Sequence, residues 1–85
     1  MEHYIKFIDI NDKSTQTHPI ELSLRLMRRH RNIVQADAAR YIGITRNTLS
    51  NYERGISEIP FTTFMRLARL YNFKILDFYE NVNEQ

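Results

Sequence analysis

Apolar positions in the middle of the chain recur at the three- and four-residue spacing of an amphipathic helix. Ala38, Ala39 and Ile42 share one face of a helix predicted over residues 35–42. Gly43 follows directly, and a residue without a side chain adopts at little cost the left-handed conformation that often ends a helix. The pattern therefore predicts a short helix that stops sharply at Gly43.

A second short helix is predicted directly after this stop. Thr45 is suited to cap its first turn by accepting a hydrogen bond from a backbone amide, and Leu49 and Tyr52 form its apolar face. The opposite face carries hydrogen-bonding side chains, namely Arg46, Asn47, Ser50 and Asn51. Two helices joined by a tight glycine turn have the form of a helix-turn-helix, and the polar face of the second fits a DNA major groove.

The flanking segments show the same helical spacing. One helix is predicted over residues 20–31. Another begins at Pro60, because proline is tolerated in the first turn of a helix, and ends at Asn72. Its buried stripe comprises Phe64, Leu67, Ala68 and Tyr71. A fifth helix is expected over residues 75–82, with Phe78 as its core residue.

The N-terminal segment has a different pattern. Tyr4–Ile10 is rich in β-branched and aromatic residues, which favours a strand, whereas residues 11–19 are polar and are expected to form a loop. A lone strand needs backbone partners. It either lies against its own helical body or pairs with the same strand of a second protomer. We therefore expect an all-α fold of five helices (residues 20–82) with an extra N-terminal β-strand arm (residues 1–19) and a tail (residues 83–85).

The predicted fifth helix has more apolar residues than one helix face can bury within its own protomer, which indicates a homodimer. The N-terminal arm is expected to form a second contact between the protomers. Deleting residues 1–12 should then weaken the dimer without unfolding the body. The expected dimer residues are Tyr4, Ile5, Phe7, Ile8 and Ile10 in the arm, and Ile75, Leu76, Phe78, Tyr79 and Val82 in the helix.

Charge is concentrated on the predicted helix-turn-helix. The 85 residues make one domain with a net charge of +2. Residues 22–54 carry seven arginines against two acids, a net of +5, whereas the segments before and after them are net acidic. The arginines are Arg25, Arg28, Arg29, Arg31, Arg40, Arg46 and Arg54. Arginine binds phosphate and guanine in a bidentate manner, so this block predicts a polyanionic partner.

The chain resembles the phage-repressor and Cro-type helix-turn-helix domains known as the XRE family. The resemblance covers roughly residues 22–79 and rests on residues in the family's order and spacing: Arg28, Gln35, Ala39, Gly43, Ile44, Thr45, Leu49, Glu53, Gly55, Leu67 and Ala68. Two positions depart from it. Ala38 stands where the family favours leucine, and Lys74 stands where serine or threonine usually caps the last helix.

The resemblance implies a site and an ion pair. The DNA-binding residues would be Gln35, Thr45, Arg46, Asn47, Thr48, Ser50, Asn51 and Arg54. Arg46 would bond a guanine edge and asparagine an adenine edge in the major groove, whereas Arg54 would meet phosphate. Arg28 and Glu53 would form a largely buried structural ion pair rather than a catalytic one.

The sequence offers no catalytic or metal-binding constellation. His3, His18 and His30 are far apart, there is no cysteine, and there is no glycine-rich phosphate loop, so we expect no enzyme, metal or cofactor. No apolar run is long enough for a membrane span. We expect a cytoplasmic, homodimeric DNA-binding regulator of prokaryotic or phage origin, a repressor that reads a palindrome. An antitoxin with a toxin partner, a restriction-modification controller, and a protein-interaction module without DNA binding remain open.

Overall fold

The computed structural model describes residues 2–81. Its elements follow the order β1 (Glu2–Asp9), β2 (Thr15–Pro19), α1 (Ile20–His30), α2 (Gln35–Ile42), α3 (Arg46–Glu53), α4 (Phe61–Leu70) and β3 (Phe73–Asn81). The described chain is therefore a mixed α/β domain of four helices and a three-stranded sheet. The prediction of an all-α fold with five helices was wrong.

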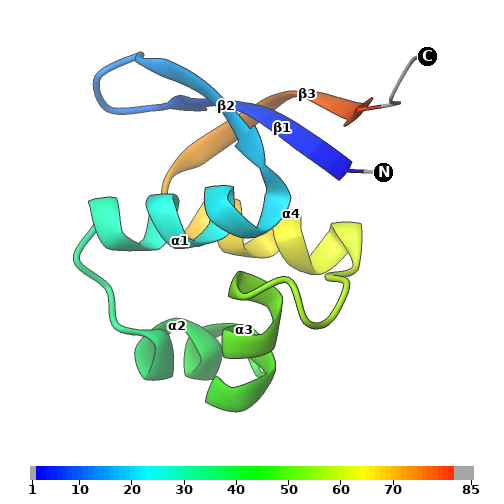
Figure 1. Cartoon of the computed structure of the whole chain (residues 1–85). Coiled ribbons are helices and arrows are strands. Elements are labelled where there is room, and N and C mark those ends of the chain that lie inside the picture. The colour runs from blue at the N-terminus through cyan, green and yellow to red at the C-terminus, as the bar shows by residue number, and fades with distance from the viewer. Residues whose placement is uncertain (1, 82–85) are drawn as a thin grey trace.

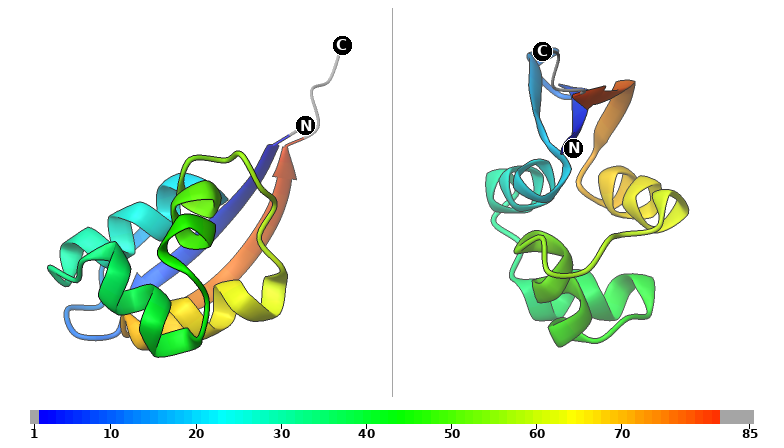
Figure 2. Two further views of the ribbon diagram at one scale, coloured as in Figure 1. Left: turned by 90° about the horizontal axis from the view of Figure 1, so that it is seen from below. Right: turned by 45° about the vertical axis from the view of Figure 1, so that its right-hand side comes forward.

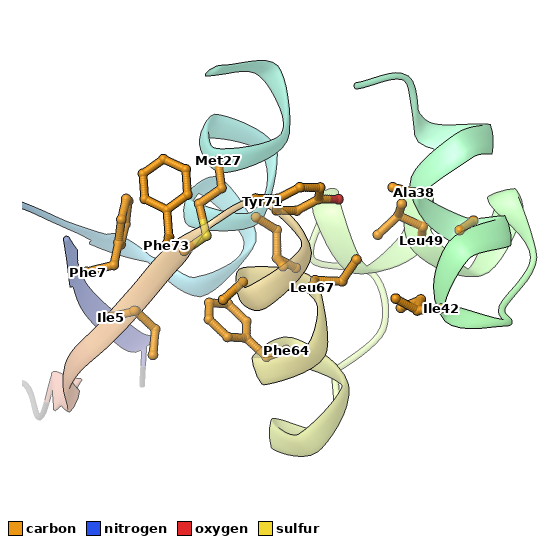
Figure 3. Packing of buried hydrophobic residues seen from close by; sticks show 13 residues of the cluster. Ile5, Phe7, Met27, Ala38, Ile42, Leu49, Phe64, Leu67, Tyr71 and Phe73 are labelled. Carbon is orange, nitrogen blue, oxygen red and sulfur yellow. The ribbon is translucent and has the colours of Figure 1, made fainter. Parts of the chain in front are cut away.

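The elements form three layers (Figure 1). The antiparallel sheet, in the order β2-β1-β3, lies on one side. Helices α1 and α4 pack beneath it, and α2 and α3 lie on the far side of these two helices (Figures 1 and 2). One cluster of buried side chains joins the layers, and it runs from Phe7 under the sheet through Tyr71 to Leu49 on α3 (Figure 3).

The N-terminal strand is the centre of the sheet rather than an arm. It pairs with β2 on one side and with β3 on the other. Ile5 and Phe7 are 0% and 1% exposed and belong to the core, so the prediction of a lone strand that offers both side chains to a partner was wrong. Among the other expected dimer residues, Tyr4, Ile8 and Ile75 are half-buried, and Ile10, Leu76, Phe78 and Tyr79 are exposed. Val82 lies outside the described residues.

The predicted loop over residues 11–19 contains a second strand. The chain turns after Asp9, whose backbone amide donates to the Ser14 carbonyl at 2.9 Å, and Lys13 adopts a left-handed φ of 65°. Residues 15–17 are exposed at the edge of the sheet. Their polar sequence gives no apolar signal, because backbone pairing to β1 holds this strand.

The predicted fifth helix is the edge strand β3. Lys6 pairs with Asp77 whereas the next residue, Phe7, pairs with Ile75, so a bulge inserts one extra residue at Leu76. Ile75 and Phe78 are therefore the cross-strand partners of Phe7 and Ile5 and face the same side of the sheet. Their spacing of three imitates the period of a helix, which explains the wrong prediction.

The predicted limits of the other helices agree closely with the structure. α1 ends one residue earlier than expected, and α4 begins directly after Pro60. Asn72 has a φ of 64° and turns the chain from α4 into β3. None of the helices in residues 2–81 combines the length and apolar character that crossing a membrane requires.

Candidate nucleic-acid interface

The turn between α2 and α3 depends on Gly43. Its φ is 83°, a left-handed value that costs a side-chain-bearing residue free energy. A Cβ atom at this position would meet no atom within 4 Å, so the requirement for glycine is conformational and not steric. The amides of Gly43 and Ile44 donate to the Ala39 carbonyl at 2.9 and 3.0 Å and close the end of α2.

Thr45 begins α3 as its cap. The Thr45 hydroxyl oxygen accepts from the Thr48 backbone amide at 3.0 Å and lies 2.8 Å from the Thr48 hydroxyl. Thr48 is also a predicted DNA contact, and its half-buried side chain lies within the cap. The two threonines therefore fix the first turn of α3, where a DNA-reading helix contacts bases.

Helix α3 has one fixed face and one free face. Leu49 is 0% exposed and Glu53 is 2% exposed, which anchors the inner face in the core. The other predicted contact residues face away from this anchor. Within the described part of the chain their side chains make no hydrogen bond or ion pair: Arg46, Asn47, Ser50, Asn51 and Arg54. The helix thus holds its hydrogen-bonding groups ready for an external partner.

The anchor includes the ion pair between Arg28 and Glu53. Arg28 donates from Nε to Glu53 Oε2 at 2.7 Å and from Nη2 to Oε1 at 3.0 Å. Its Nη1 also donates to the Ile33 carbonyl at 2.8 Å, so α1, the segment before α2 and the end of α3 are tied together. The hydrogen bonds to Glu53 raise the pKa of Arg28, and the guanidinium stays charged.

Gln35 lies beside this pair. Its side-chain amide donates to Glu53 Oε1 at 3.0 Å, and the side chain is half-buried. We expected Gln35 to contact phosphate at the start of α2. The structure shows an internal contact for its amide nitrogen and places its backbone at the helix N-terminus.

A second buried network, around Arg31, joins the sheet to the helices. Arg31 donates to the two carboxylate oxygens of Asp9 at 2.7 and 3.2 Å and to the Tyr71 carbonyl at 2.6 Å. Its guanidinium lies 4.5 Å from the centre of the Phe73 ring. The hydrogen bonds from Arg31 lower the pKa of Asp9 to about 2. In the sequence Arg31 is one of the seven arginines whose charge predicts a polyanionic partner, because nothing local links it to Asp9.

Tyr71 is completely buried between the layers. Its ring lies at the end of α4, and its hydroxyl points toward α2 and α3 (Figure 3). Within the described residues this hydroxyl is the one buried side-chain polar atom without a hydrogen-bond partner. Burial raises the pKa of Tyr71, so the phenol stays neutral.

The surface that carries the remaining arginines differs in charge from a groove elsewhere on the molecule. With Arg28 and Arg31 used internally, five arginines of residues 22–54 remain on the surface, and Arg40 forms an exposed pair with Asp37 at 2.7 Å. A groove of about 640 Å³ lies between the α3–α4 loop and the sheet. Its lining includes Glu21 and Glu58 and contains no lysine or arginine. The groove therefore does not suit a phosphate backbone.

One group of side chains in the described part of the chain has the spacing of metal ligands. Asp9, Asp12 and His30 each bring one ligand atom within 4.8 Å of the others. The Asp9 carboxylate is already bonded to Arg31, whose positive charge opposes a cation. We therefore assign no metal to this group.

Comparisons with known proteins agree with the geometry of α2 and α3. A family model described as helix-turn-helix matches residues 24–78. Searches of curated proteins and of solved structures gave no significant match. The matched segment begins in α1, contains α2, the Gly43 turn, α3 and α4, and reaches into β3.

Proposed function

Because the chain belongs to the XRE family of helix-turn-helix proteins, whose members are DNA-binding regulators, we propose that it is a homodimeric transcriptional repressor. It reads a palindromic operator in double-stranded DNA, with α3 in the major groove. The observation that carries the proposal is the contrast between the two faces of α3. Leu49 and Glu53 fix one face, and the polar side chains of the other face have no partner within residues 2–81.

The free face offers direct base contacts. Arg46 and Asn47 stand in the first turn of α3, and Asn51 stands one turn later. Arginine donates to both acceptors on the major-groove edge of guanine, and asparagine pairs with adenine through one donor and one acceptor. These groups need little reordering on binding, because the Thr45 cap already fixes the turn that carries them.

The surrounding groups suit the phosphate backbone. α2 and α3 each present an N-terminus with unpaired backbone amides and a partial positive charge. Arg54 follows α3, is exposed and suits a phosphate rather than a base. The two subunits of a dimer would occupy half-sites about one helical turn apart, which is the spacing expected for such proteins.

Selection of bound sequences from a random duplex pool tests this proposal. We expect an enriched motif with two-fold symmetry. A pool without any enriched motif would contradict DNA reading and would favour a protein-interaction module of the same fold.

Two arginine variants then separate base reading from backbone binding. Arg46→Ala should cost about 1–3 kcal/mol on the selected site and relax the preference at one symmetric position. Arg54→Ala should weaken selected and scrambled duplexes equally and reduce the salt slope by about one unit for each phosphate that is no longer neutralised. Arg66→Ala on α4 removes the same charge outside α2 and α3 and serves as the control. An equal loss of affinity for both duplexes in Arg46→Ala would mean that Arg46 binds phosphate instead.

A further inference from the structure

The outer edge of β3 is open. The strand order β2-β1-β3 leaves β3 with β1 as its neighbour on one side and no strand on the other within residues 2–81. We infer that a second copy of the chain pairs antiparallel along this edge and joins the two sheets into one six-stranded sheet. The inference rests on the proposed function, because it specifies how the proposed homodimer is assembled.

The flank of the molecule around this edge is apolar. Leu76 and Phe78 on β3 are each 45% exposed, and Tyr79 is 39% exposed. Beneath β3, Phe61 and Met65 of α4 are 53% and 40% exposed, and their spacing of four places them on one helix face. The Phe61 and Phe78 rings are 6.0 Å apart, so this α4 face adjoins β3. A second copy would cover strand and helix together and would bury apolar area on both.

The order of charges along β3 favours pairing with itself in the antiparallel sense. Lys74 lies near the start of the strand and Glu80 lies near its end, whereas Asp77 is the central residue and pairs with Lys6 of β1. Antiparallel pairing of two identical strands places the basic start of each opposite the acidic end of the other. Parallel pairing would place like charges side by side.

The symmetry of such a pair suits a palindrome. Two antiparallel strands in one sheet are related by a two-fold axis perpendicular to the sheet, so both sheets keep the same face on the same side. In each copy α1 and α4 cover one face, and α2 and α3 lie beyond them (Figures 1 and 2). Both α3 helices would then face one side of the dimer, as binding to one DNA duplex requires. Parallel pairing would turn them to opposite sides.

One backbone donor of β3 is already bonded inside the protomer. The Phe78 amide donates to the Asp77 carboxylate at 2.8 Å, so this one donor has a partner inside the protomer. The other backbone groups along the outer edge have no strand to pair with among the described residues.

A cysteine scan along β3 tests the inference, since the chain contains no cysteine of its own. In an antiparallel pair of identical strands, a residue close to the two-fold axis faces the same residue of the second copy. The two Cα atoms are then about 4.5–5.5 Å apart, a distance that a disulfide can span. Lys74→Cys, Leu76→Cys, Asp77→Cys and Tyr79→Cys are oxidised separately in the full chain. We expect covalent dimers at one or two of these positions. Ile10→Cys, at a similarly exposed site beside the β1–β2 turn, is the control and should give no covalent dimer.

Sedimentation of two charge variants gives a second measurement. Leu76→Glu should weaken the dimer by about tenfold or more, because the two-fold axis introduces the charge twice. Ile10→Glu should leave the dimer unchanged. A monomeric wild-type protein, or a dimer that gives no β3 cross-link, would overturn the inference.

The two proposals can fail separately. Selection of a palindromic motif without β3 cross-links would leave the proposed function standing and reject the interface. Cross-links at β3 without an enriched motif would leave the interface standing and reject the function.

Discussion

The α2–α3 unit and the sheet are held together by opposite means. In the α2–α3 unit, one glycine, one threonine cap and the Arg28–Glu53 pair fix two short helices, all within about a third of the chain. The sheet depends on backbone pairing between strands from opposite ends of the described chain and on Ile5 and Phe7 beneath it. The outward side chains of α3 take no part in either arrangement. Their identities can therefore change without loss of the fold.

The largest expected effect comes from deleting residues 1–12. This removes the central strand together with Ile5 and Phe7, and truncating a single buried residue of this size costs about 2–5 kcal/mol. Because a small domain is stable by only about 5–15 kcal/mol, the truncated chain should be unfolded. Circular dichroism melting checks this. A cooperative transition in the truncated protein would show that the helices fold without the sheet.

The next effect concerns the anchor of α3. Arg28→Ala leaves Glu53 buried without its partner and should destabilise the fold by about 3–5 kcal/mol. The double variant Arg28→Met with Glu53→Leu removes both charges and should be much milder. Chemical denaturation of the two proteins gives the comparison. Equal losses of stability would mean that the charges do not act as a pair.

A smaller effect is expected where the sheet meets α1, and it depends on pH. The pKa of Asp9 is lowered from 3.8 to about 2 in the folded protein, mainly by its hydrogen bonds with Arg31. The unfolded chain therefore takes up the proton first as the pH falls, so the stability due to Asp9 is complete above pH 4 and is lost toward pH 2. Asp9→Asn should be less stable than the wild type at pH 6, and the difference should shrink between pH 4 and pH 2.

Urea denaturation across this pH range measures the Asp9 contribution. Asp37→Asn, which alters an exposed ion pair on α2, is the matched control, because exposed pairs contribute little to stability. A difference between Asp9→Asn and the wild type that stays constant down to pH 2 would contradict the role of the Arg31 contact.

The smallest effect is expected at Tyr71, where the two regions meet. Tyr71→Phe removes a buried hydroxyl that has no partner among the described residues. Leaving such a group unpaired costs about 1–3 kcal/mol, so the variant should be as stable as the wild type or slightly more stable. Leu67→Ala, a neighbouring core truncation, should instead destabilise by about 2–5 kcal/mol. A clear loss of stability in Tyr71→Phe would indicate that the hydroxyl makes a bond in solution.

The same contrast explains what could be predicted from the sequence. Gly43 ends α2 and Thr45 caps α3 through hydrogen bonds to residues within about one turn. Both helix limits could therefore be predicted from neighbouring residues in the sequence. The pairing of Arg28 with Glu53 came from the family resemblance. The pairing of β1 with β3 depends on residues at opposite ends, and the bulge at Leu76 gave β3 the spacing of a helix. The ion pair between Arg31 and Asp9 could not be predicted for the same reason, because the two residues lie far apart in the sequence.

The sheet around β1 cannot be complete during synthesis until β3, the last of the described elements, has been made. The ribosome makes β1 and β2 first and β3 last of the described elements. While the helices are being made, the sheet therefore consists of the β1–β2 hairpin without its third strand. The α2–α3 unit then rests on a core that lacks its third strand, and we expect little DNA binding from the nascent chain. Protease challenge of chains stalled at increasing lengths should show protection only once Asn81 has left the exit tunnel. We therefore expect a chain with this strand order to bind DNA only once the edge strand β3 has been made.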